Sequence, residues 1–197
     1  SLPILPPVVL QPGVYESITV LAGNAQFQPG VYIIRNVNPL TQISLNLAGG
    51  TINAQGVMFY ITTNGAYAPD SPGPDASDGE NEPGYTLLGS ELPSVLIAPG
   101  LIGTNMTGLV DGGQFNGMLV YQRRADRRPI IIAQQNLIGF GNIQGTVYAK
   151  WGHVLLVSSG TYNMRFVAGT MRVATVLDTT IAPSNLLPPA QDIFLVE

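Results

Sequence analysis

The feature that most constrains this chain is a glycine followed by β-branched and aromatic residues, repeated along its length. The pentapeptide QPGVY stands at residues 11–15 and again at residues 28–32. The full series of glycine-led runs is GVY at Gly13, GVYII at Gly30, GVMFY at Gly56, GMLVY at Gly117, GTVYA at Gly145 and GTMRV at Gly169. Proline and glycine favour a turn, whereas Val and Tyr favour a strand. Each run therefore predicts a corner that opens into a strand.

The spacing of these glycines predicts how the corners are arranged. Successive starts lie 17, 26, 61, 28 and 24 residues apart, and all but the long interval are close to one coil of a parallel β-solenoid. Ile43, Leu45 and Leu47 alternate with polar residues, as in a half-buried strand. No stretch combines a helical apolar period with helix start and stop signals. We therefore expect one all-β domain over residues 1–197, a right-handed parallel β-helix of about six coils, with a β-sandwich as the alternative.

The 61-residue interval predicts one long inserted loop. Residues 66–89 are rich in proline and glycine and carry five of the twelve acidic residues. Carboxylate oxygens suit calcium, although their spacing here does not follow the EF-hand frame. A calcium site, the one cofactor considered, and a solvated loop both remain open. The candidate ligands are Asp70, Asp75, Asp78, Glu80 and Glu82.

A second charged segment, QRRADRR at residues 122–128, holds four of the eight basic residues: Arg123, Arg124, Arg127 and Arg128. These arginines could bind an anionic sugar or a phosphate, because guanidinium groups match such anions in geometry. They could instead pair with acidic groups of the same chain or of a neighbouring subunit. The third interpretation is a solvated turn in which Asp126 offsets part of the charge.

Composition narrows the class of function. Only 10% of the residues are charged while 45% are hydrophobic, which is unusual for a free monomer and favours a subunit of an oligomer. The net charge of −4 argues against nucleic-acid binding, and no apolar run is long enough to span a membrane. Proline-punctuated apolar tails at residues 1–12 and 183–197 are candidates for inter-subunit contacts.

Catalytic patterns are weak. The chain has one histidine, His153, and no cysteine, so few residues are available to form a nucleophilic triad. Outside the acidic loop, only Asp111 and Asp126 lie near the expected central face, so we do not expect an enzyme. Recurrent tyrosines predict rings stacked inside or along the solenoid, and outward-facing rings would offer a carbohydrate platform. These tyrosines are Tyr15, Tyr32, Tyr60, Tyr121 and Tyr148.

Four glycine-led segments carry a family resemblance. They are GVYIIRN (30–36), GVMFYITTNG (56–65), GMLVYQRR (117–124) and GTVYAKWG (145–152). Their order over about residues 28–175 resembles the glycine-rich β-helical regions of TadG-like bacterial surface proteins associated with Flp/Tad pili. The resemblance implies an extracellular structural role and brings no known active site.

Together these features predict a secreted structural or adhesive protein of the cell surface, a homo-oligomer that self-assembles into a filament, a pilus-like structure or a layer. Its expected partner is itself, with surface polysaccharide as a further candidate. The alternative is a carbohydrate-binding or polysaccharide-lyase-type β-helix, since parallel β-helices also carry such activities.

Overall fold

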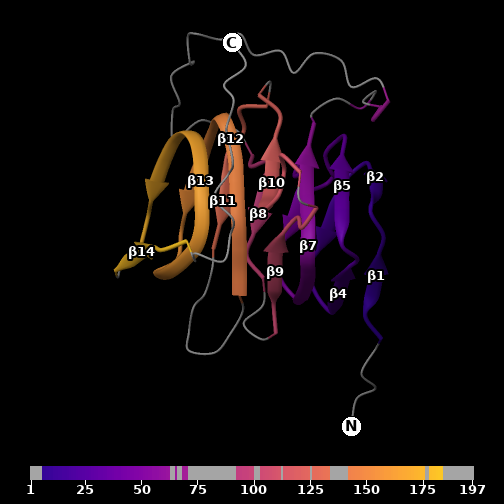
Figure 1. The fold of residues 1–197 in the computed structure, drawn as a ribbon, viewed down its shortest axis with the longest axis horizontal. Helices are drawn as coiled ribbons and strands as arrows, with labels where there is room; N and C mark the ends of the chain where they lie inside the picture. Colours follow the sequence, from indigo (N-terminus) through magenta and orange to yellow (C-terminus); the bar gives the residue numbers. More distant parts are fainter. Residues whose placement is uncertain are drawn as a thin grey trace.

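The described part of the chain is built from β-strands alone (Figure 1). The structure, a computed structural model, describes residues 6–62, 65, 68–70, 92–99, 103–111, 113–124, 126–133, 142–175 and 178–183. Within these ranges there is no helix, so the predicted all-β class is confirmed. The strands are β1 (Val8–Leu10), β2 (Gly13–Tyr15), β3 (Ile18–Val20), β4 (Asn24–Phe27), β5 (Gly30–Ile34), β6 (Leu45–Leu47), β7 (Thr51–Ile61), β8 (Val95–Ile97), β9 (Asn105–Gly108), β10 (Met118–Gln122), β11 (Ile130–Ile132), β12 (Asn142–Leu156), β13 (Gly160–Val173) and β14 (Thr179–Ile181).

The strand pairs of the described residues are all parallel and follow three ladders. The first ladder runs β1, β4, β7, β9, β12, β13, β14. The second runs β2, β5, β7, β10, β12, β13, and the third runs β3, β6, β8, β11, β12, β13. Figure 1 shows this succession from β1 and β2 at the right to β13 and β14 at the left. A β-sandwich is antiparallel, so this pairing does not fit that alternative.

The core consists of apolar side chains stacked in register along the ladders. In the second ladder the buried column is Tyr32, Phe59, Val120 and Val147. In the third ladder it is Ile18, Leu45, Val95, Ile130 and Val154. Each such side chain contributes about 1.5–3 kcal/mol through burial. Adjacent ladders thus share one continuous apolar interior.

The two QPGVY copies form similar corners, although they are not in register. In each copy the tyrosine hydroxyl donates to the carbonyl of the glutamine four residues earlier: Tyr15 to Gln11 at 2.5 Å and Tyr32 to Gln28 at 2.8 Å. Gly13 nevertheless pairs with Tyr32 rather than with Gly30. The second copy is therefore displaced by two residues along the strand, which the letters alone do not reveal.

A third corner of this kind was not recognised in the sequence. Tyr162 donates from its hydroxyl to the carbonyl of Ser158 at 2.7 Å, again four residues earlier. The shared pattern is glycine, one residue, then tyrosine: G-V-Y twice and G-T-Y at residues 160–162. This spacing between glycine and tyrosine is common to the three corners that the structure describes. None of the described segments forms a helix with the length and hydropathy that a membrane crossing requires.

Candidate functional site

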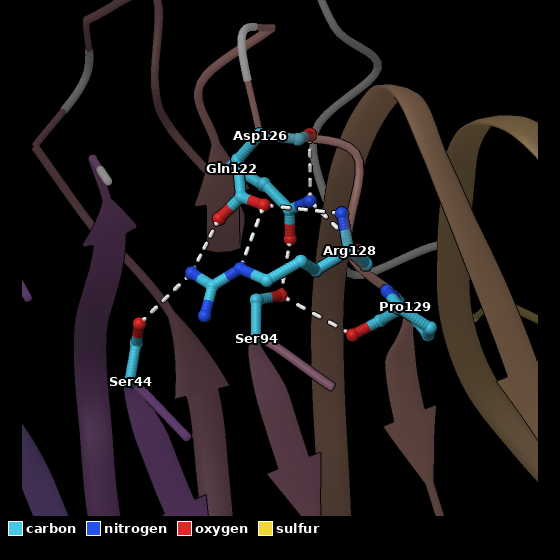
Figure 2. Close-up of polar contacts among 6 residues, drawn as sticks. All are labelled: Ser44, Ser94, Gln122, Asp126, Arg128 and Pro129. Carbon is cyan, nitrogen blue, oxygen red and sulfur yellow. Dashed lines mark hydrogen bonds and ion pairs between the residues drawn. The ribbon is translucent and has the colours of Figure 1, made fainter. Parts of the chain in front are cut away.

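The arginine-rich turn between β10 and β11 is held by a buried polar cluster, drawn in Figure 2. Gln122 lies in the second ladder in register with Ile61, and it is fully buried. Its side-chain nitrogen donates to the carbonyls of Asp126 (2.8 Å) and Arg128 (3.0 Å), closing the turn. Its side-chain oxygen accepts from the hydroxyl of Ser94 at 2.6 Å. Because every one of these groups is paired, burying the amide costs little.

Arg128 completes this cluster through an ion pair within the chain (Figure 2). Its Nε lies 3.0 Å from Asp126 Oδ1 and its Nη2 lies 2.8 Å from Asp126 Oδ2, a bidentate arrangement. Nη2 also donates to the hydroxyl of Ser44 at 3.1 Å. The Asp126 side chain is 1% exposed and that of Arg128 is 21% exposed. Of the three interpretations of the arginines, pairing within the same chain is the one that describes Arg128.

The other arginines of the turn engage different surroundings. Arg123 is 6% exposed, so a soluble anion could not reach its guanidinium without a rearrangement. Arg124 is half-buried and donates from Nε to the hydroxyl of Tyr148 at 3.2 Å. Arg127 is half-buried in the same turn. The four arginines therefore do not present one shared exposed face, and their role in anion binding or assembly stays a prediction.

The recurrent tyrosines divide between the inside and the outside. Tyr32 is fully buried, and the ring of Tyr15 lies 5.9 Å from it between centroids. Tyr60, Tyr121 and Tyr148 instead alternate with buried neighbours and form a half-buried outer stack, with centroids 5.2 Å and 4.7 Å apart. The rings in this stack lie nearly parallel and cover one another's faces. The faces that a sugar would need are therefore largely used within the stack.

The glycine spacing also separates these two groups. The outer tyrosines follow their glycine by four residues (Gly56 to Tyr60) or three (Gly145 to Tyr148), whereas the corner tyrosines follow by two. Gly30 is in register with Val57 rather than with Gly56, so Tyr32 lies beside Phe59 while Tyr60 lies beside Ile33. Side chains alternate between the faces of a strand, so this register, and not the count of residues after the glycine, places Tyr32 on the inner face and Tyr60 on the outer face.

His153 is a buried structural residue. It is 4% exposed, and its Nδ1 lies 2.6 Å from the hydroxyl oxygen of Thr170, its register partner on β13. Burial lowers the pKa of His153 below its ordinary value of 6.5, and the nearby charge of Arg172 lowers the pKa further. Both effects favour the neutral imidazole, which fits a residue held by a structural hydrogen bond.

This lowered pKa predicts a pH-dependent stability. Above pH 6.5 the imidazole is neutral in both states, and its contribution to folding is fully present. As the pH falls through 6.5, the unfolded chain takes up the proton before the folded chain does, and stability is lost. We expect urea unfolding of the wild type to show a steeper loss below pH 6.5 than unfolding of His153→Gln. Parallel pH profiles of the two proteins would contradict this.

The candidate calcium ligands Asp75, Asp78, Glu80 and Glu82 lie outside the described residues. Asp70 is described and is exposed. Among the described residues, no group of three or more His, Asp or Glu side chains is placed to hold a metal ion. The calcium site therefore stays a prediction that rests on the sequence alone.

The two ends of the ladders carry an unexpected concentration of exposed apolar side chains. Eight of the twelve exposed large hydrophobic residues found in the described part of the chain lie at these ends. At one end they are Val8 (66% exposed), Val9 (49%), Val14 and Leu21; at the other they are Val167, Met171, Val173 and Ile181. Within the described residues, β1, β2 and β3 each pair on one side only, as does β14. Open strand edges lined with apolar side chains are the usual sites of further strand pairing.

Comparisons with known proteins found no match to the chain among protein families, curated proteins or solved structures. The functional conclusion therefore depends on the chain's own geometry.

Proposed function

We propose that this protein is a structural subunit of an extracellular or cell-surface assembly, and that it associates with copies of itself through the two ends of its ladders. The proposed fold is a right-handed β-solenoid of about six coils. The order of the ladders supports it, because successive passes of the chain each add one strand to each ladder. The glycine-led motifs, which resemble those of TadG-like surface proteins, are consistent with the same role.

The observation that carries the proposal is the position of the exposed apolar side chains. A free monomer normally covers open strand edges with charges, prolines or a cap. Here β1 presents Val8 and Val9, and β13 presents Met171 and Val173. Edge strands of this composition favour association, because pairing satisfies backbone groups and removes apolar surface from water. The low fraction of charged residues in the chain also favours association.

Light scattering of the full chain across a concentration series tests the proposal. We expect the mass of the wild type to rise above that of one chain (20.8 kDa) as concentration increases. Val9→Lys places a charge on the exposed edge of β1 and should shift this rise to higher concentration.

Leu40→Lys is the matched control, because Leu40 is 93% exposed and lies in the connection between β5 and β6, not on a strand that ends a ladder. It adds the same charge and should leave association unchanged. A wild-type chain that stays monomeric over the whole series would refute the proposal.

A further inference from the structure

We propose that copies of this chain stack head to tail, with β1 of one copy pairing in parallel with β14 of the next. This inference rests on the proposed function and names the partner surface, its polarity and its register. β1 is the outermost strand of the first ladder at one end, and β14 is the outermost strand of the same ladder at the other.

Strand direction favours this polarity. All pairings in the described residues are parallel, so the edges at both ends belong to strands that run the same way. A copy added head to tail continues the ladder with the same parallel geometry. A two-fold contact between identical ends would instead set one open edge against its own copy in antiparallel orientation. Only the head-to-tail arrangement repeats a pairing that the chain already uses.

The side chains of the first ladder fit the same arrangement. Its inward column is Leu10, Phe27, Ala54, Met106 and Ile143, and it continues to Ile181 through Tyr162, which precedes the register partner of Gln144 by one residue. The column begins and ends on an aliphatic residue, so pairing β1 with β14 would place Leu10 beside Ile181 of the next copy. Val9 and Thr180 each precede a residue of this column and point outward, so they would lie side by side.

The corner tyrosines mark the same register. The hydroxyl of Tyr32 donates to the carbonyl of Leu10 at 2.9 Å. Leu10 is the last residue of β1, the strand that pairs with β4. Tyr162 lies 3.5 Å from the carbonyl of Ile132, the last residue of β11. Each hydroxyl therefore reaches the last carbonyl of a strand that lies one pass earlier in the chain. Tyr15 follows β1 in the same way. The strand end that its hydroxyl would face is Ile181 of the stacked copy.

Among the described strands, the contact involves the first ladder alone. β14 pairs with residues 160–162 of β13 and so lies one strand beyond the rest of β13. When β1 meets β14, the third ladder is left with two strand spacings between β3 and β13, about 9.5 Å. A disulfide needs Cα atoms about 4.4–6.8 Å apart, so it can form across the first ladder and not across the third.

Engineered cysteines test this register cleanly, because the chain has no cysteine of its own. Val9→Cys and Thr180→Cys, both at exposed outward positions, are mixed as full chains and oxidised. We expect a disulfide-linked dimer in the mixture, lost on reduction, and only background from either variant alone. A mixture of Thr19→Cys and Arg172→Cys, which share an outward column of the third ladder, should give background, as should Leu40→Cys.

The outcomes separate this inference from the function on which it rests. A dimer from Val9→Cys alone or from Thr180→Cys alone indicates a two-fold contact and overturns the head-to-tail polarity. A dimer from the Thr19→Cys and Arg172→Cys mixture, or equal linking by Leu40→Cys, overturns the register. If no mixture links while light scattering detects oligomers, the inference fails and self-association stands. If the wild type is monomeric, the proposed function itself fails.

Discussion

Replacing Gly50 by alanine is expected to lower the free energy of unfolding by about 3 kcal/mol, one of the two largest effects of a single change that we expect in this chain. Gly50 has a φ of +66°, a left-handed conformation that costs a residue with a Cβ about 1–2 kcal/mol. The added Cβ would also lie well inside van der Waals contact distance of the carbonyl oxygen of Gly23 and 3.0 Å from the carbonyl carbon of Ala22. Overpacking against fixed backbone costs about 1–3 kcal/mol more. Urea unfolding at equilibrium measures the sum.

Gly23 provides the matched control for this substitution. Its φ of +77° is similarly left-handed, yet a Cβ at this position meets nothing within 4 Å. Gly23→Ala should therefore cost only about 1 kcal/mol, the conformational part. The difference in unfolding free energy between the two variants measures the cost of the close contact between neighbouring passes of the chain. Equal losses for Gly50→Ala and Gly23→Ala would show that the backbone relaxes and that this packing is not tight.

Arg128→Met is expected to cost about 3 kcal/mol at neutral pH. The substitution leaves the Asp126 carboxylate, 1% exposed, without the guanidinium that holds it through two bonds. Removing one member of a buried ion pair leaves an uncompensated charge, which is more costly than removing both. We therefore expect the double variant Asp126→Ala/Arg128→Met to recover part of the loss. Unfolding of the wild type, both single variants and the double variant gives the coupling energy.

Arg127→Met controls for the loss of a positive charge from the same turn. Arg127 is half-buried beside Arg128, so this variant removes an equal charge without breaking the pair with Asp126. Its stability should stay within about 0.5 kcal/mol of the wild type. A loss from Arg127→Met as large as that from Arg128→Met would mean that net charge, rather than the ion pair, stabilises the turn.

Only one side of the proposed assembly surface can be predicted from the sequence. The apolar, proline-punctuated stretch at residues 1–12 was predicted to make inter-subunit contacts, and it contains β1 with its exposed valines. The other predicted tail, residues 183–197, lies outside the described residues from 184 onward. Met171 and Val173 at the opposite end were not predicted. Their strand resembles interior strands in sequence, and only its place as the last member of a ladder leaves them exposed.

The sequence by itself determined the local structure of this protein: strands and corners, an all-β class and the absence of helical patterning. These follow from glycine, proline and β-branched residues, whose preferences act over a few neighbours. The tertiary structure alone decided which residues meet. It placed Gln122 in the core beside Ser94, paired Arg128 with Asp126, and turned Tyr32 inward but Tyr60 outward. Such outcomes depend on register, because a shift of one residue exchanges the two faces of a strand, and register is set by partners distant in the sequence.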